Sequence, residues 1–357
     1  MCDDMPDFED FDDEADDDDD DFPDFDDDWD RDSSGPTETI MDKHEAAEIN
    51  DVAPSSLSHL IGQRGVIDQV RVALDAAQMD GKKFDHALLV GPPGMGKSAL
   101  AAVIAQEMAT DFHEVLGQSI KNAADLNTLL LSAKNKDVVH IDECHELSKE
   151  YQTALYLAVD KRKLIIQNGK TPMTLPLADF TLLLSTTDEY GLLQPCRDRM
   201  KLLLRFDFYS EPELVEVLRH RSKALRWSVD EVVFTEIPKR AKGTPRLALR
   251  LLQSARRCAR AEGETTITLD HFHRACGLER IDNLGLGPTE TKYLQILTNG
   301  ATRLNVLASM LGLPSRTVSE VTEPFLVRAG LIIKDDQGRR QLTQFGFDHC
   351  GQNARPD

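Results

Sequence analysis

The chain lacks the features that mark a membrane or secreted protein. No stretch of its 357 residues is apolar for long enough to cross a bilayer. The N-terminus carries no basic segment followed by an apolar one, so a secretory signal is not indicated. We therefore expect a cytoplasmic protein.

Cysteine is scarce and scattered. The six cysteines lie far apart and form no C-x-x-C pair, which suits a reducing compartment and excludes a disulfide framework. His140, Cys144 and His145 are close in sequence, but no second pair of metal ligands follows them. The spacing therefore does not predict a zinc site.

Positive charge is nearly absent from the beginning of the chain. Between Asp3 and Asp32 there are 20 acidic residues and one basic residue, Arg31, which leaves 42 acidic and 40 basic residues in the rest. The composition of residues 1–50 predicts a disordered acidic tail on a nearly neutral body, so the low pI does not exclude a nucleic-acid partner. Two interpretations of the tail remain open. It is a solubilising segment, or it imitates nucleic-acid charge and competes for the DNA surface of its own chain.

The region from residue 57 to 208 alternates short apolar runs with helical patterns. This alternation is typical of a parallel sheet with helices on both faces. The expected strands are 87–90, 138–141, 180–185 and 202–206, and the expected helices are 66–79, 98–108 and 123–132. Two apolar runs around Asn168-Gly169 predict a β-hairpin that projects from the sheet.

Two smaller modules are expected after the sheet. Leucines recur at helical spacing from Glu211 to about Arg280, which predicts an all-helical lid. Three helical patterns then precede the apolar runs Leu331–Lys334 and Arg340–Thr343, an arrangement that predicts a winged helix. The predicted fold class is thus α/β with two added modules. Its segments are an acidic tail (1–50), a P-loop core (51–210), a helical lid (211–282), a winged helix (283–350) and a short tail (351–357).

Residues Gly91-Pro-Pro-Gly-Met-Gly-Lys97-Ser98 fit the phosphate-binding pattern G-x-x-x-x-G-K-[ST]. The apolar run 87–90 precedes the loop and an alanine-rich helical pattern follows it, which is the context that this motif requires. The loop's N–H groups and the helix N-terminus favour phosphate, Lys97 reaches the β- and γ-phosphates, and Ser98 binds Mg²⁺. The motif predicts that the chain binds a nucleoside triphosphate.

Further polar residues follow apolar strand patterns. Asp142 and Glu143 end the run 138–141, about 45 residues after the P-loop. We assign Asp142 to the metal and Glu143 to the polarisation of the attacking water. Thr187 ends the next strand, where it can sense the γ-phosphate.

Three arginines complete the set. Arg197 and Arg199 lie just beyond the sheet, where such residues enter the site of a neighbouring subunit. Arg246 opens a lid helix, where it can reach the γ-phosphate of its own subunit.

The order GPPGMGKS, IDE, TT, RDR and GTPR resembles that of the AAA+ ATPases. Within them the chain is most similar to the RuvB family of bacterial Holliday-junction branch-migration motors. The similarity runs from about Pro54 to Asp348 and includes the C-terminal segment Thr322-Glu-Pro-Phe-Leu326, which is more specific than the P-loop. The resemblance implies an ATP-dependent DNA helicase of recombination and repair. Such a protein works as a ring, commonly a hexamer, associated with the nucleoid and with a junction-binding partner, RuvA.

The resemblance also implies roles for individual residues. ATP would be held by Gly91, Pro92, Pro93, Gly94, Met95, Gly96, Lys97, Ser98, Ala99, Ile61 and Tyr209, the last beside the adenine. Mg²⁺ would be held by Ser98 and Asp142. Catalysis would use Glu143, Asp142, Thr187, the finger Arg199 with Arg197, and the second sensor Arg246. DNA phosphates would be held by Arg339 together with Arg316, Arg328 and Arg340.

Three features depart from the family pattern. Asp188-Glu-Tyr-Gly191 replaces the usual Arg-Ala-Gly after the threonines, the hairpin before Phe180 is shorter, and the acidic tail is additional. These differences leave open a paralogue of the motor, and they leave three functions to compare. The first is a junction motor, the second an ATP-switched winged-helix regulator without translocation, and the third an AAA+ machine that acts on protein.

Overall fold

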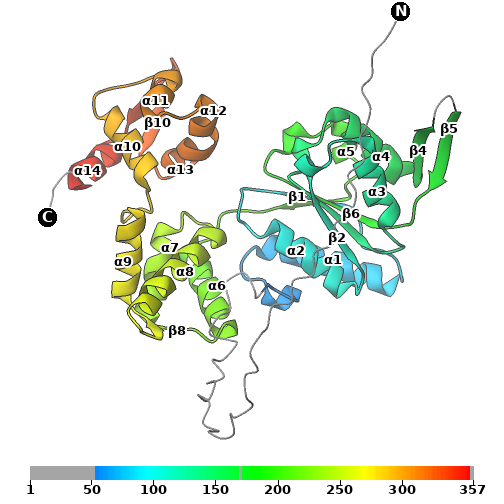
Figure 1. Ribbon diagram of the computed structural model, residues 1–357, viewed down its shortest axis with the longest axis horizontal. Helices are drawn as coiled ribbons and strands as arrows, with labels where there is room; N and C mark the ends of the chain where they lie inside the picture. The colour runs from blue at the N-terminus through cyan, green and yellow to red at the C-terminus, as the bar shows by residue number, and fades with distance from the viewer. Residues whose placement is uncertain (1–52, 169–170, 354–357) are drawn as a thin grey trace, which may run out of the picture. The chain divides into compact units, whose positions relative to one another are not determined.

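The computed structural model describes residues 53–168 and 171–353 (Figure 1). The predicted acidic tail lies outside the described residues, as do the last four residues of the chain. Within the described part, no helix is both long and apolar enough to cross a membrane.

A five-stranded parallel sheet forms the centre of the first module, in the order β2-β3-β6-β1-β7. Its strands are β1 (Ala87–Val90), β2 (Phe112–Leu116), β3 (Val138–Asp142), β6 (Thr181–Thr186) and β7 (Leu202–Arg205). The helices are α1 (Arg64–Met79), α2 (Lys97–Glu107), α3 (Ala123–Ser132), α4 (Lys149–Lys161) and the short α5 (Gln194–Arg197). Four short 3₁₀ turns are Leu57–His59, Gly117–Ser119, Cys144–Glu146 and Glu189–Gly191.

Hydrophobic cores lie on both faces of this sheet. Leu89 and Leu183 pack with apolar residues of α1 and α2, whereas Leu88 and Leu184 pack with those of α3 and α4. Successive residues of a strand point to opposite faces, so continuous apolar strands are needed to fill both cores. The predicted doubly covered parallel sheet is confirmed, with all four expected strands and all three expected helices present.

The predicted hairpin is also present. β4 (Lys163–Asn168) pairs antiparallel with β5 (Thr171–Pro176), with Asn168 opposite Thr171. Figure 1 shows these two strands extending away from the parallel sheet.

The lid is a helical module with its own core. Its elements are α6 (Glu211–Ala224), β8 (Ser228–Val229), α7 (Glu231–Arg240), α8 (Pro245–Ala261), β9 (Thr266–Ile267) and α9 (Leu269–Glu279). Leu218, Leu252 and Phe272 are fully buried in the core between the helices. The prediction of helices is confirmed, and the structure adds a two-residue parallel pairing of β8 with β9.

The C-terminal module is a winged helix, as predicted. Its helical elements are α10 (Pro288–Leu297), α11 (Leu304–Leu311), α12 (Ser315–Thr317), a π-helical turn (Val318–Thr322), α13 (Glu323–Arg328) and α14 (Gln344–Asn353). The wing consists of β10 (Ile332–Lys334) and β11 (Arg340–Leu342), paired antiparallel. Leu307, Leu326 and Ile332 are buried in the core of this module.

Candidate functional site

The loop from Gly91 to Gly96 joins the end of β1 to the start of α2, as the motif predicts. Gly94 and Gly96 have φ angles of +80° and +95°, which side-chain-bearing residues rarely adopt. A Cβ atom at Gly94 would also lie 2.9 Å from Cβ of Arg246. The glycines therefore let the loop turn its backbone inward and pass close under the lid.

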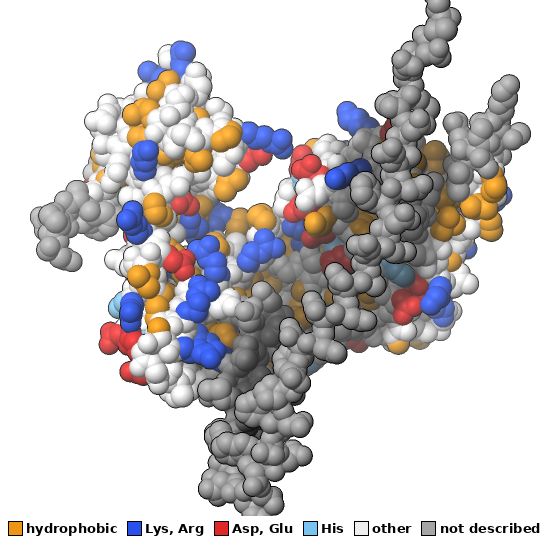
Figure 2. Space-filling model, in the orientation of Figure 1, with side chains coloured by type: hydrophobic (Ala, Val, Ile, Leu, Met, Phe, Trp, Pro, Cys, Tyr) orange, Lys and Arg blue, Asp and Glu red, His pale blue; other side chains and the backbone are white. Residues whose placement is uncertain are grey.

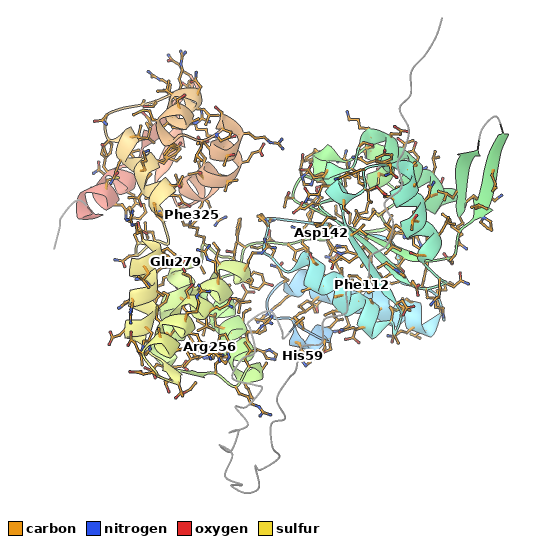
Figure 3. All side chains as sticks on the ribbon, viewed as in Figure 1. His59, Phe112, Asp142, Arg256, Glu279 and Phe325 are labelled. Atoms are coloured by element: carbon orange, nitrogen blue, oxygen red, sulfur yellow. The ribbon has the colours of Figure 1, made fainter. Side chains whose placement is uncertain are left out.

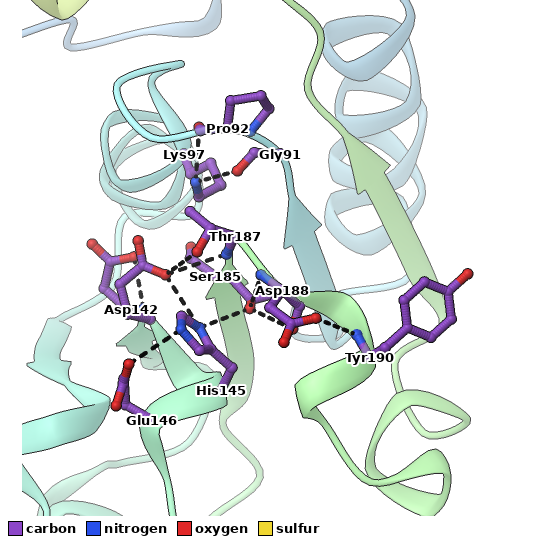
Figure 4. A network of polar contacts seen from close by, with 12 residues as sticks. Gly91, Pro92, Lys97, Asp142, His145, Glu146, Ser185, Thr187, Asp188 and Tyr190 are labelled. Atoms are coloured by element: carbon purple, nitrogen blue, oxygen red, sulfur yellow. Dashed lines mark hydrogen bonds and ion pairs between the residues drawn. The ribbon is translucent and has the colours of Figure 1, made fainter. Parts of the chain in front are cut away.

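Lys97 is the first residue of α2 and its side chain is almost completely buried. Its Nζ donates to the carbonyl oxygens of Gly91 at 2.7 Å and Pro92 at 3.1 Å (Figure 4). Burial lowers the pKa of this ammonium, and the nearby carboxylates of Glu143 and Asp142 act in the opposite direction. The amine is therefore held at the loop, within the electrostatic influence of both acids.

Ser98 and Asp142 are brought together from different elements. Ser98 Oγ in the first turn of α2 donates to Asp142 Oδ2 at the end of β3, at 2.9 Å. Oxygen atoms of hydroxyl and carboxylate groups are the ligands that Mg²⁺ prefers. This pair therefore fits the predicted metal-binding role.

Glu143 has a positive φ of 48°, and the chain is packed tightly around it. A Cβ atom at Gly117 would lie 2.6 Å from the Glu143 carbonyl oxygen, so residue 117 must be small. Glu143 Oε2 accepts hydrogen bonds from both N and Oγ1 of Thr187, each at 3.2 Å. The two residues directly follow the neighbouring strands β3 and β6, and the predicted sensor thus contacts the predicted base.

His145 joins this cluster, although the sequence analysis treated it only as a rejected zinc ligand. Its Nδ1 lies 3.3 Å from Glu143 Oε2 and 3.1 Å from Thr186 Oγ1, and its Nε2 lies 3.3 Å from Glu146. The signal that could have identified it is its place two residues after the acid pair. His145 and Thr187 thus contact the same carboxylate oxygen of Glu143.

A cavity of about 530 Å³ lies over the loop and extends to the lid. That volume is in the usual range for a small-molecule site. Its lining includes the predicted residues Ile61, Pro93, Gly94, Met95, Gly96, Lys97, Ser98, Ala99, Asp142, Glu143, Tyr209 and Arg246. Gly91 and Pro92 contribute through their carbonyl contacts with Lys97 rather than through the lining.

Tyr209 closes the cavity at the junction with the lid. Its hydroxyl donates to the Met95 carbonyl oxygen at 3.4 Å, and burial raises its pKa to about 12. Gly62 (φ +71°) leaves room for the ring, because a Cβ there would lie 2.7 Å from Tyr209 Cε1. His59, which Figure 3 labels, and His220 also line the cavity, with ring centroids 5.7 Å apart. Neither histidine was predicted to belong to the site, because a lone histidine gives no signal in a sequence.

The predicted finger residues lie elsewhere. Arg199 stacks over Tyr156 at 4.8 Å and donates to the Pro195 carbonyl oxygen at 2.8 Å. Arg197 lies 5.1 Å from the Tyr190 ring centroid. Neither arginine is among the described residues that line the cavity of their own chain. The structure therefore brings the predicted nucleotide residues together and leaves the two finger arginines apart from them.

The segment that departs from the family pattern makes specific contacts. Glu189 Oε2 pairs with Arg205 Nη1 at 2.7 Å, and Asp188 Oδ1 accepts from Tyr190 N at 3.0 Å. Tyr190 lies under Arg197, as described above. Residues of this segment thus contact two arginines, Arg205 and Arg197.

The four winged-helix arginines divide into two pairs. Arg316 is exposed and Arg339 is half-buried, and they make ion pairs with Glu320 and Asp335 of the same module. Figure 2 shows further Lys and Arg side chains scattered over the visible surface. An exposed intramolecular ion pair contributes little to stability, so these two arginines are available to an anion.

Arg340 and Arg328 make contacts with other parts of their own chain. Arg340 is buried, and its Nε donates to the buried Glu323 at 2.7 Å. Arg328 lies over the Phe208 ring at 3.4 Å and donates to a lid carbonyl at 2.6 Å. Both guanidinium groups are engaged within the chain, because each is packed against residues distant in sequence. Arg340 is thus held inside the module, whereas Arg328 makes its contacts from an exposed position.

Three family models match consecutive parts of the chain. They are the Holliday junction DNA helicase RuvB P-loop domain over residues 52–206, the RuvB AAA lid domain over 209–282, and the RuvB C-terminal winged helix domain over 283–351. The matches cover nearly all of the described residues.

Curated relatives and solved structures agree with these matches. The chain is 33% identical over 311 residues to the RuvB subunit of the Holliday junction branch migration complex of Fervidobacterium nodosum, covering 85% of this chain and 89% of the relative. For the Thermotoga maritima subunit the identity is 34% over 322 residues, covering 88% and 95%. The solved structure of the Thermotoga maritima RuvB Holliday junction branch migration motor superposes with a TM-score of 0.74 at 33% identity, covering 84% and 97%.

Proposed function

The chain belongs to the RuvB family of AAA+ ATPases, and from that premise we propose that it is an ATP-driven motor that moves DNA at Holliday junctions. The observation that carries this proposal is the match of a P-loop core, lid and winged helix in one chain, with Lys97, Ser98, Asp142 and Glu143 on the lining of one cavity. The core, lid and winged helix are assigned to residues 51–210, 211–282 and 283–350. Their tasks are hydrolysis, response to nucleotide and contact with DNA.

The loop residues 91–99 hold the triphosphate of ATP. Their backbone N–H groups and the N-terminus of α2 attract the anion, and Lys97 exchanges its loop carbonyls for phosphate oxygens. Tyr209 and Ile61 contact the adenine end of the cavity, and Arg246 reaches the γ-phosphate from the lid. The support for this placement is their common position on the lining of one cavity.

Hydrolysis depends on the cluster at the ends of β3 and β6. Ser98 and Asp142 would hold Mg²⁺, which would neutralise charge that develops on the phosphates. Glu143 orients the attacking water and accepts its proton, while Thr187 positions the carboxylate and responds to the γ-phosphate. The contacts of Glu143 Oε2 with Thr187 support this division of roles.

Arg199, with Arg197 beside it, acts on the nucleotide of a neighbouring subunit. Both lie apart from the cavity of their own chain, and their guanidinium groups stack on Tyr156 and Tyr190. An arginine supplied in trans stabilises charge in the transition state and is worth roughly 10³–10⁵ in rate. The functional unit is then a ring, and hydrolysis in one subunit depends on the position of the next.

Arg316 and Arg339 contact the DNA backbone, which gives binding that depends on salt and little on sequence. The hairpin β4–β5 is the candidate contact for a RuvA-like junction-binding protein. The acidic tail, which lies outside the described residues, either solubilises the chain or competes with DNA for the same basic side chains.

The test is ATP turnover by the purified full chain without DNA, with linear duplex and with a synthetic four-way junction. We expect the four-way junction to stimulate ATP turnover most, because a DNA motor is activated by the DNA on which it moves. Lys97→Ala is the matched blank, since it removes the phosphate contact and leaves the winged helix unchanged. Turnover that none of the DNA substrates changes would refute the proposed motor function. Slow turnover combined with nucleotide-dependent DNA affinity would instead identify an ATP-controlled DNA-binding switch.

A further inference from the structure

Lys242 connects the lid to the winged helix. It lies between α7 and α8, and its Nζ donates to Glu290 Oε1 in α10 at 2.6 Å. The same ammonium lies 4.9 Å from the ring centroid of Phe325 in α13 (Figure 3). Both charged side chains are mostly buried, 16% and 20% exposed, so water screens this pair less than a surface pair. This mostly buried contact is therefore a junction between the lid and the winged helix.

Arg328 at the end of α13 forms the second half of this junction. Its Nη2 donates to the backbone carbonyl oxygen of Lys242 at 2.6 Å. Its guanidinium lies 3.4 Å from the ring centroid of Phe208 and 5.4 Å from that of Phe325. Burial between these rings lowers the pKa of Arg328. A planar guanidinium suits this position, because it stacks on a ring and donates in its own plane at the same time.

The lid side of the junction continues directly into the nucleotide cavity. Phe208 precedes Tyr209, whose N donates to the Gly243 carbonyl oxygen at 3.0 Å and whose hydroxyl reaches the P-loop. Gly243 follows Lys242 and has a φ of +75°, and a Cβ there would lie 3.2 Å from Cβ of Phe208. Three residues later, Arg246 packs against the P-loop. Two short backbone paths thus run from the junction to Tyr209 and Arg246, which both line the cavity.

We propose that Lys242 and Arg328 are positioning residues that couple the winged helix to the nucleotide cavity, through Phe208–Tyr209 and through Gly243–Arg246. This inference rests on the proposed function, since it describes how DNA on the winged helix alters ATP binding and hydrolysis. A displacement of α13 moves Arg328, and with it the ring of Phe208 and the carbonyl of Lys242. By thermodynamic linkage, nucleotide binding changes DNA affinity by the same factor by which DNA changes nucleotide affinity.

The first experiment compares Arg328→Ala and Arg328→Lys in the full chain, with Arg303→Ala as the control. Arg303 is an exposed cation of the winged helix, so its removal changes the charge equally. Affinity for a fluorescent ATP analogue is measured without DNA, and turnover is measured at saturating four-way junction. We expect nucleotide affinity to fall about tenfold in both Arg328 variants. The ratio of turnover with DNA to turnover without DNA should fall by a similar factor, which is within the usual range of coupling between two sites. Arg303→Ala should match the wild type in both measurements.

The lysine variant separates this role from a phosphate contact. Lysine keeps the charge but cannot stack and donate as a plane, so a positioning role makes it resemble alanine. The proposal would be overturned if Arg328→Lys behaved like the wild type and Arg328→Ala lost only its affinity for DNA. If DNA does not change turnover by the wild type, the proposed motor function fails. The nucleotide affinities measured without DNA still test the positioning role of Arg328.

A charge exchange provides a second test that does not depend on Arg328. Lys242→Glu and Glu290→Lys each place like charges together, and we expect each to reduce nucleotide affinity. The double variant restores opposite charges and should recover most of the loss. Single variants that bind nucleotide like the wild type, or a double variant no better than the singles, would refute the coupling. Thermal unfolding of all three variants identifies any loss that comes from misfolding.

Discussion

Removal of Arg340 should destabilise the winged helix rather than weaken DNA binding directly. Glu323 is 1% exposed. Its carboxylate accepts hydrogen bonds from Arg340 at 2.7 and 3.2 Å and from the Tyr293 hydroxyl at 3.0 Å, and it pairs with Lys334 at 3.0 Å. Deleting one partner of a buried ion pair costs about 3–5 kcal/mol, because the remaining charge stays buried. Lys334 still contacts the carboxylate in Arg340→Ala, so we expect the lower end, about 3 kcal/mol.

Hydrogen exchange in the full chain measures this loss. Amides of α10, α13 and β11 should exchange about a hundred times faster in Arg340→Ala, since each ~1.4 kcal/mol corresponds to a factor of ten. Arg316→Ala is the matched control, because its exposed pair with Glu320 should change protection by less than about 0.5 kcal/mol. Unchanged protection in Arg340→Ala, together with a shallower salt dependence of DNA binding, would show that Arg340 holds a phosphate.

The same network makes a pH prediction. Burial by itself raises the pKa of Glu323, but hydrogen bonds from Arg340, Lys334 and Tyr293 outweigh it and hold the pKa below its ordinary value of 4.5. A depressed carboxyl pKa stabilises the fold above the unfolded value, and that stability is lost as pH falls through the folded value. Protection of the wild-type winged helix should therefore decline below about pH 4.5, and Glu323→Gln should flatten that decline.

Three further predictions concern the nucleotide site and the tail. Arg199→Ala should abolish hydrolysis but spare ATP binding, and mixing it with Lys97→Ala subunits should partly restore turnover; normal hydrolysis by Arg199→Ala would exclude the finger role. Gly94→Ala should raise KM for ATP roughly tenfold, because its Cβ would press on Arg246 from a positive φ that costs about 1 kcal/mol or more; an unchanged KM would show that the loop adapts freely. Deletion of residues 1–50 should tighten DNA binding at low salt if the tail competes with DNA, and equal affinities in a titration would leave it a solubilising segment.

Periodicity and motif spacing could predict the sheet and the nucleotide site because both depend on local patterns. Ala87–Val90 and Val138–Asp142 are nearly continuous apolar runs, as central parallel strands must be. β2 was missed because it is an edge strand: Phe112–Leu116 is mostly half-exposed and includes His113 and Glu114. The P-loop required no tertiary information, since its function follows from glycines at fixed offsets before a helix.

The partners of Arg340 and Arg328 could not be predicted from the sequence. A sequence shows charge but not the partner of that charge, and the partners here are remote. Arg340 meets Glu323, 17 residues away, and Arg328 meets the carbonyl of Lys242, 86 residues away. Surface and buried arginines are therefore indistinguishable until the fold places an acceptor beside them. His145 was underestimated in part for the same reason: its contact with Glu143 is local, but its contact with Thr186 spans 41 residues.

The junction at Lys242 affects how fragments of this protein behave. A fragment that starts at residue 283 follows the sequence boundary between modules and retains Glu290, Phe325 and Arg328. It loses Lys242 and Phe208, so Glu290 is left without its cation and the guanidinium without its stacking partner. A fragment of residues 51–282 exposes the opposite half of the same contact. Neither piece reproduces the surface it has in the intact chain, so affinities measured on isolated modules will not sum to those of the whole protein.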